Sequence, residues 1–210
     1  MSESVTPRES AGAPGEAQGR PGPGWRKDLW PWPAIVAVLA VAAYQLRRQG
    51  RLWWCSCGEL YLWSGDTRGA HTSQHLFDPY SFTHILHGVV LCGVLAWAVS
   101  RLSPLWRFCL AVSLETLWEV FENSDFIIQR YRAATISLGY QGDTIANSLG
   151  DIASFGIGYV LAGRLGFRGS LAFFAVTEAV LLLWIGDSLL LNIVMLIHPI
   201  EGIKAWQMGR

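Results

Sequence analysis

The chain has 210 residues, of which 51% are hydrophobic and 15% charged, and its mean hydropathy is positive at +0.29. Soluble domains carry about 25% charged residues, so this composition indicates a membrane protein. Sixteen basic and sixteen acidic side chains give a net charge of zero, which leaves no basic excess for binding nucleic acid.

The first 24 residues are rich in Ser, Gly, Pro and Glu and contain almost no large apolar side chains. Such a segment cannot bury enough apolar surface to offset its chain entropy. We therefore predict a disordered tail over residues 1–24 and a transmembrane helical domain over residues 25–210. Residues 25–32 combine Arg26 and Lys27 with three tryptophans, a pattern typical of an anchor at the membrane interface.

Five apolar segments predict an all-α fold, a polytopic transmembrane helix bundle with about five spans. A spanning helix needs about 20 mostly apolar residues. The predicted spans are residues 32–46, 81–99, 105–121, 144–161 and 170–184. The first span is short and follows two basic residues, so a signal peptide is the alternative for it. The apolar stretch 187–197 either extends the fifth span or forms a short interfacial or re-entrant helix.

The alternation of these spans places two long loops, residues 45–80 and 123–142, on one side of the membrane. The start of the second span, the end of the third and the start of the fourth lie on that same side. Basic residues are divided equally between the two sides, eight against eight, so the positive-inside rule leaves the orientation open.

Three predicted spans carry polar residues on one helix face, at the ends that meet on this side. The three sets are His84 and His87; Glu115, Glu119 and Glu122; and Asp143, Asn147 and Asp151. Within each set the spacing of three or four residues places neighbours on the same face. Their expected depths, at about 1.5 Å per residue, also match, which predicts a single polar pocket.

The expected depths form three layers. His84, Glu122 and Asp143 lie near the surface, His87, Glu119 and Asn147 about one turn in, and Glu115 and Asp151 about two turns in. Ionisable groups inside a membrane are costly and usually mark function, so we interpret the pocket as a ligand or catalytic site. The alternative is that these groups only join helix to helix by hydrogen bonds.

Mixed imidazole and carboxylate donors suit a hard or borderline divalent metal, which could activate water against a lipid-linked phosphate or ester. The expected metal ligands are His84, His87, Glu115, Glu119 and Glu122. The candidate catalytic residues are Glu119, Asp151 and His87. The candidate ligand-binding residues are Arg130, Arg132, Asp143 and Asn147. Arg forks bind phosphate in a bidentate way, so the two arginines could bind a lipid headgroup, although we favour a solvated juxtamembrane basic pair for them. A membrane lipid is the expected partner of the protein.

Cys55 and Cys57 lie early in the first long loop, directly after two tryptophans. A lone Cys-x-Cys pair is weak as a metal motif, because zinc sites usually space their cysteines by two to four residues. His71 and His75 could complete a metal site, and a disulfide is a second option if the loop is extracytoplasmic. We favour a third interpretation, an aromatic hairpin at the membrane interface.

Residues 53–207 resemble an uncharacterised protein family of bacterial integral membrane proteins, defined by a domain of unknown function. The resemblance is carried by the stretches 53–58, 73–88, 115–123, 130–132 and 139–151, with Asp187, Asn192, Trp206 and Gln207. It implies a place in the membrane and supplies no activity. A looser similarity to VanZ-like membrane proteins rests on His84 or His87, Glu119 or Glu122, and residues 143–150, and implies an association with the cell envelope.

The sequence therefore predicts a multi-pass protein of the bacterial inner membrane. We expect its pocket to open on one face and to bind a metal ion, a lipid headgroup or both; whether it catalyses a reaction is left open. The alternative is a non-catalytic envelope or assembly protein whose polar residues only hold the bundle together. A transporter is disfavoured because the five spans show no obvious inverted repeat.

Overall fold

The computed structural model describes residues 29–135 and 139–209. The expected disordered tail and the first half of the tryptophan-rich anchor, residues 25–28, lie outside the described residues. Over the described residues the chain is all-helical, with seven helices and a single isolated bridge between Trp63 and Phe77. The prediction of an all-α fold is confirmed.

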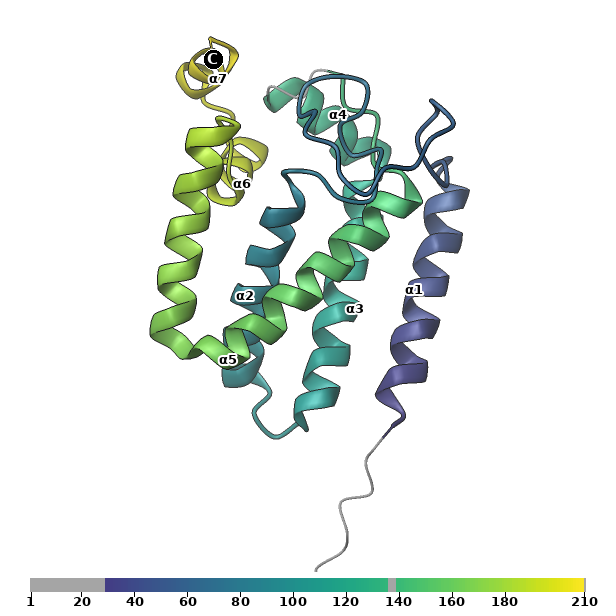
Figure 1. Cartoon of the computed structure of the whole chain (residues 1–210), viewed down its shortest axis with the longest axis vertical. Helices are drawn as coiled ribbons and strands as arrows, with labels where there is room; N and C mark the ends of the chain where they lie inside the picture. The colour runs from purple at the N-terminus through teal and green to yellow at the C-terminus, as the bar shows by residue number, and fades with distance from the viewer. Residues whose placement is uncertain (1–28, 136–138, 210) are drawn as a thin grey trace, which may run out of the picture.

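Four long helices make up the bundle, and three short ones lie at or near one end of it (Figure 1). The long helices are α1 (Pro31–Arg48), α2 (Ser81–Ala98), α3 (Pro104–Glu122) and α5 (Ile145–Trp184). The short helices are α4 (Asp125–Ala134), α6 (Leu189–Ile197) and α7 (Glu201–Met208). The start of α2, the end of α3 and the start of α5 lie at the same end, as the alternation of spans predicted.

The fourth and fifth predicted spans form two limbs of the single helix α5. The helix breaks at Gly166, where the backbone adopts φ 65° and ψ −179°. Only glycine adopts this conformation without strain. The second limb therefore turns back towards the end of the bundle at which α5 begins (Figure 1).

The segment 123–142 contains helix α4, so its prediction as a plain loop is wrong. The Ser124 side chain caps α4 by accepting the N–H of Ile127 at 3.4 Å, and Asp125 lies in the first turn. This helix is short and more polar than a span, so a search for long apolar segments passes over it. The stretch 187–197 forms the separate helix α6, because Gly186 has a positive φ of 73° and Ser188 caps a new helix.

Helix α2 and the first limb of α5 pack closely through glycine. A Cβ atom on Gly158 would overlap the carbonyl oxygen of Ile85, and one on Gly88 would overlap that of Phe155. Small residues at such contacts let two helix backbones approach. This close packing fixes the polar faces of α2 and α5 against each other.

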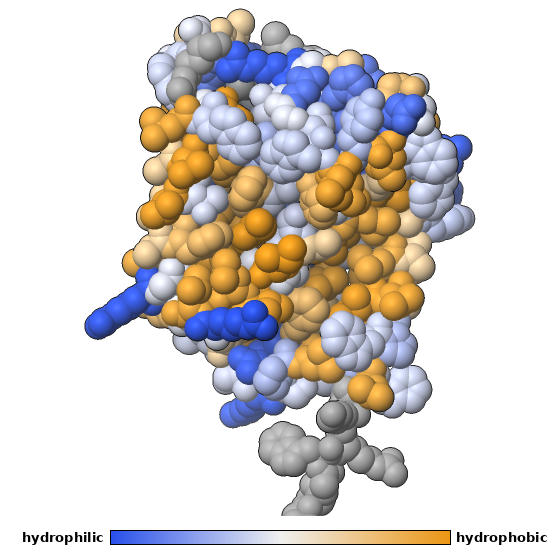
Figure 2. All heavy atoms as spheres, viewed as in Figure 1, coloured by the Kyte–Doolittle hydropathy of each residue, from blue (hydrophilic) through white to orange (hydrophobic). Residues whose placement is uncertain are grey.

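Two helices, α2 and α5, are long and apolar enough to cross a membrane by length and composition. Helices α1 and α3 occupy the ranges predicted for spans, but α3 carries four charged side chains. Figure 2 shows an apolar band across the middle of the molecule, between more polar ends. Large apolar side chains such as Trp97, Leu171 and Leu183 are exposed to the surroundings.

Candidate functional site

Helices α2 and α3 bring four of the predicted metal ligands together. Nδ1 of His84 lies 2.7 Å from Oε1 of Glu115 and 3.2 Å from Oε1 of Glu119. Nδ1 of His87 lies 3.0 Å from the same Glu115 oxygen. We call these four residues the His–Glu cluster. All of them except the partly buried His87 are buried.

Donor atoms of Glu122 also come close to this cluster. One donor atom each from His84, Glu119 and Glu122 lie within 4.8 Å of one another, as do those of His84, His87 and Glu115. His84 belongs to both groups. All five predicted metal ligands therefore meet around one histidine.

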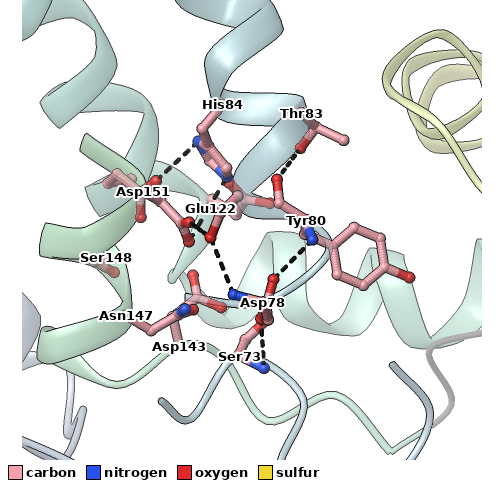
Figure 3. A network of polar contacts seen from close by, with 12 residues as sticks. Ser73, Asp78, Tyr80, Thr83, His84, Glu122, Asp143, Asn147, Ser148 and Asp151 are labelled. Atoms are coloured by element: carbon pink, nitrogen blue, oxygen red, sulfur yellow. Dashed lines mark hydrogen bonds and ion pairs between the residues drawn. The ribbon is translucent and has the colours of Figure 1, made fainter. Parts of the chain in front are cut away.

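Helix α5 adds Asp151 on the other side of the His84 ring (Figure 3). Oδ2 of Asp151 lies 3.9 Å from Nε2 of His84, and Ser81 donates its hydroxyl to Oδ1 of Asp151 at 2.7 Å. Partners on the second ring nitrogen orient a histidine and fix which nitrogen faces a ligand. Asp151 lies on the Nε2 side of the His84 ring at ion-pair distance, too far for a direct hydrogen bond, while Nδ1 lies near the two glutamates.

The predicted pairing by depth is wrong for His84. We expected it in the surface layer with Glu122 and Asp143, but it contacts Glu115 and Glu119, one to two turns deeper on α3. The predicted depths were calculated from the rise per residue alone, which assumes that the helices are parallel and begin at the same depth in the membrane. In the structure the segment before α2 folds into the bundle, since Asp78 and His75 are buried, and α2 begins correspondingly deeper.

Glu119 is fully buried, and neither of its carboxylate oxygens has a hydrogen-bond partner. Oε1 does lie within ion-pair distance of His84, so the geometry supplies an electrostatic contact without an aligned hydrogen bond. Glu122 is half satisfied, because Tyr131 donates its hydroxyl to Oε1 at 2.8 Å while Oε2 is buried without a partner. Buried carboxylates without partners are costly unless a proton or a cation neutralises them.

A cavity of about 80 Å³ adjoins the cluster. One wall is polar and includes His84, His87, Glu122 and Asp151. The apolar part of the lining consists of Trp118 of α3 and Leu189, Ile193 and Leu196 of α6, which also contributes Asn192. No Lys or Arg is among the described residues that line it. This volume holds an ion with a few waters, and among the described lining residues only the two histidines could offset the charge of its acids.

Asp143 lines the cavity, but both of its carboxylate oxygens are occupied. Tyr140 donates its hydroxyl to Oδ1 and Asn123 its amide to Oδ2, each at 2.8 Å. Burial raises the pKa of Asp143, while these two hydrogen bonds act in the opposite direction. Asn147 is fully buried outside the cavity lining and donates to the carbonyl of His75 at 2.9 Å. Both residues hold loops in place, so the structure does not support Asn147 as a direct ligand.

The structure does not bring the two predicted arginine ligands to the cavity. Arg130 donates from Nε to the carbonyl of Leu196 at 2.8 Å and from a terminal nitrogen to that of Ile197 at 3.1 Å. It therefore caps the C-terminal end of α6. Arg132 donates to the carbonyl of Tyr140. Neither arginine lines the cavity and each donates to backbone carbonyls, so a headgroup role for these side chains stays a prediction.

Three hydroxyl donors at the site were not singled out from the sequence: Ser81, Tyr131 and Tyr140. Each donates to a carboxylate of the site, respectively Asp151, Glu122 and Asp143. All three fall inside stretches that carry the family resemblance. Their place in these stretches was the only sequence feature that could have marked them as site residues. A single hydroxyl residue forms no periodic pattern that could be recognised.

The chain matches, over residues 46–209, a family described as protein of unknown function (DUF2585). A UPF0314 protein of Paracoccus denitrificans (strain Pd 1222) is 43% identical over 177 residues, which cover 84% of this chain and 92% of the relative. A UPF0314 protein of Rhizobium meliloti (strain 1021) is 40% identical over 186 residues, covering 88% and 93%.

No solved structure matches the chain. The looser similarity to VanZ-like proteins finds no support in these comparisons. The resemblance to an uncharacterised bacterial family is confirmed. The chain belongs to the DUF2585 family, and its bacterial relatives are UPF0314 proteins.

Proposed function

We propose that this chain is a multi-pass protein of the bacterial inner membrane that holds a divalent metal ion in the His–Glu cluster. The cavity beside the ion accepts the polar headgroup of a membrane lipid. The five-span arrangement predicted from the sequence is part of this proposal. The apolar band in Figure 2 and the two span-like helices support it.

The observation that carries the proposal is the state of Glu119. Its carboxylate is fully buried and has no hydrogen-bond donor, yet it lies 3.2 Å from an imidazole nitrogen. A carboxylate that only joined helices would accept a well-aligned hydrogen bond from a hydroxyl, an amide or a basic side chain. A carboxylate that binds a metal needs its lone pairs free.

The charge at the site supports a cation more than a neutral network. Three carboxylates, those of Glu115, Glu119 and Asp151, lie within 4.0 Å of His84. Even if His84 and His87 were both protonated, two positive charges would face three negative ones. A divalent ion would offset the remainder, and imidazole with carboxylate is a donor set that such ions accept.

The cavity walls support an amphipathic partner. Ionisable groups of α2, α3 and α5 line the cavity, and α6 adds three apolar side chains, Leu189, Ile193 and Leu196, beside the polar Asn192. A lipid could place its headgroup beside the ion and its first acyl carbons against α6. A bound metal would polarise a phosphate or ester oxygen or lower the pKa of a bound water.

The second candidate function is structural, with a polar network that only locks the bundle. Two variants, Glu119→Gln and Glu119→Leu, distinguish the metal-binding function from the structural one. Each is purified in detergent, and Mn²⁺ is titrated into it by calorimetry. Glutamine keeps the shape of the side chain and removes its charge. If the cluster binds metal, Glu119→Gln keeps a melting temperature close to the wild type and loses Mn²⁺ binding by at least tenfold.

If the polar network only stabilises the bundle, the opposite results are expected. Glu119→Gln would then leave both the melting temperature and Mn²⁺ binding unchanged, and wild-type chain would itself bind no Mn²⁺. Glu119→Leu would lower the melting temperature by leaving its polar neighbours unpaired. That pattern would overturn the proposed function. An exposed carboxylate offers the control: Asp125→Asn, whose side chain is 89% exposed on α4, should bind Mn²⁺ as the wild type does.

A further inference from the structure

The loop between α1 and α2 contains a second group of metal-type ligands, separate from the His–Glu cluster. Over its described residues this loop has no helix or strand beyond the isolated Trp63–Phe77 bridge. It nevertheless folds so that one donor atom each from Cys55, Cys57, His71 and His75 lie within 4.8 Å of one another. We propose that these four residues bind one zinc ion, which fixes the loop over the end of the bundle.

The distances fit a tetrahedral site. With zinc–sulfur bonds near 2.3 Å and zinc–nitrogen bonds near 2.0–2.1 Å, neighbouring donors of a tetrahedron lie about 3.3–3.8 Å apart. Sγ of Cys55 lies 3.6 Å from Nδ1 of His71. Nδ1 of His71 and Nε2 of His75 are 2.9 Å apart, so these two rings have to separate by a few tenths of an ångström on binding.

The backbone around the ligands is already ordered in ways that suit a metal loop. The N–H of Cys57 donates to Sγ of Cys55 at 3.4 Å, which positions that sulfur. Gly58 follows with a positive φ of 87° and turns the chain back. At the other pair of ligands, the carboxylate of Asp66 accepts the N–H of His71 at 3.1 Å and fixes that residue.

The hydrogen bonds of the ring nitrogens show that His71 and His75 are not equally ready to bind a metal ion. The N–H of Tyr61 donates to Nδ1 of His75 at 3.2 Å, so in the neutral ring Nε2 carries the proton and donates to Nδ1 of His71. The lone pair of His71 Nδ1 therefore already faces the site. His75 has to move its proton to Nδ1 and give up the Tyr61 contact before its Nε2 can bind metal.

Binding replaces two thiol protons, which pass to the solvent, so that a Zn²⁺ ion with two thiolates and two neutral imidazoles carries no net charge. A neutral centre suits a loop next to the membrane. Cys57 is exposed, whereas Cys55 and His75 are buried, so the ion can enter from the Cys57 side. The carbonyl of His75 accepts from Asn147 of α5, and Thr72 and Ser73 line the cavity, which links the loop to the His–Glu cluster.

Cobalt(II) titration of the full chain in detergent, under reducing conditions, tests the proposal. Cobalt bound to thiolate gives a charge-transfer absorption, whereas cobalt in the His–Glu cluster, which contains no sulfur, gives none. The two sites can therefore fail independently. We expect this absorption to saturate at one thiolate-bound Co²⁺ per chain, whether or not the His–Glu cluster takes a second ion, and Zn²⁺ to displace the bound cobalt. Cys57→Ser, an exposed substitution, should abolish it, and Cys92→Ser on α2 should leave it unchanged.

Histidine variants test the ligand assignment beyond any effect on folding. His71→Ala should weaken cobalt binding at least tenfold, and His71→Cys should restore it because a thiolate can replace the imidazole as ligand. His75→Ala should weaken it less than His71→Ala does. The proposal is overturned if reduced wild-type chain shows no thiolate absorption, or if Cys57→Ser retains it. It is equally overturned if the chain purified without reductant holds a Cys55–Cys57 disulfide, seen as two missing hydrogens by mass, and still binds no cobalt after reduction.

Discussion

Nδ1 of His84 and Oε1 of Glu115 lie 2.7 Å apart, although the two residues are 31 positions apart and only 6% and 2% exposed. The contact joins the first turn of α2 to the middle of α3. Charged or charge-assisted contacts at this distance are strong only where water is excluded. The pair therefore fixes the depth at which the other ionisable residues of the site can meet.

The arrangement of the loops predicts which residues share one side of a membrane. Ser64 lies in the loop before α2 and Gln141 in the segment before α5, and both segments lie at the same end of the bundle (Figure 1). Cysteines introduced at these two positions should be labelled by an impermeant thiol reagent from one side of the membrane. Ser100→Cys, in the turn between α2 and α3, should be labelled from the other side. Labelling of Ser64→Cys and Gln141→Cys from opposite sides would rule out the five-span arrangement.

The close contact between α2 and α5 predicts a sharp difference between two glycines of one helix. Gly158→Ala places a methyl group against the carbonyl oxygen of Ile85, and overpacking of this kind costs about 1–3 kcal/mol. Gly163→Ala meets nothing within 4 Å and should be neutral or stabilise α5 by up to about 1 kcal/mol. Denaturant unfolding in mild detergent measures both free energies. Equal effects of the two variants would show that the α2–α5 contact is loose.

Asp187, between α5 and α6, predicts a dependence of stability on pH. Burial raises its pKa to about 6, although the Ser188 N–H and the Tyr80 hydroxyl donate to it. The folded chain then holds the proton more tightly than the unfolded chain, whose Asp pKa is about 3.9. Ionisation therefore lowers the free energy of unfolding as pH rises from about 4 to about 6.

Asp187→Asn removes this titration. The free energy of unfolding of the variant relative to the wild type should rise by on the order of 3 kcal/mol between about pH 4 and pH 7. Because the comparison is a change with pH, any constant loss from the altered hydrogen bonds cancels. The exposed Asp125→Asn variant should parallel the wild type across the same range. A flat difference for Asp187→Asn would mean that this carboxylate is not buried.

Capping of α6 predicts the consequence of removing Arg130. Hydrogen bonds to charged groups contribute about 1.5–3 kcal/mol, and Arg130 donates two of them to the last carbonyls of α6. Arg130→Ala should speed hydrogen exchange at α6 amides by at least about tenfold. Arg168→Ala, an exposed arginine on the second limb of α5, should leave α6 unchanged. Unchanged exchange in Arg130→Ala, with weaker binding of a phospholipid headgroup, would support a headgroup role for this side chain instead.

Much of the helical framework was predictable, because long apolar segments leave few alternatives to a helix. The ranges of α1, α2, α3 and both limbs of α5 follow the hydropathy pattern closely. Periodicity also placed His87, Glu115 and Asp151 on inward faces, and the structure brings their helices together at one site. Helices α4 and α7 were not predicted, since both are short and amphipathic and depend on contacts with the rest of the chain.

The sequence predicts which residues belong to the site better than it predicts which of them contact one another. Arg130 donates to the end of α6, 66 residues away in sequence, and no local pattern encodes that contact. The loop ligands show the same limit. The spacing of Cys55 and Cys57 is weak as a motif, and only the fold of the loop brings His71 and His75 next to them.

The metal content of the chain in a background without the loop site tests the central claim most directly. Cys55→Ser with Cys57→Ser removes the thiolate ligands, so metal that co-purifies in this background reports on the His–Glu cluster. We expect close to one divalent ion per chain by elemental analysis, and less than a tenth of that after the further change Glu119→Gln. A background chain without bound metal, or equal metal content with and without Glu119→Gln, would contradict the account.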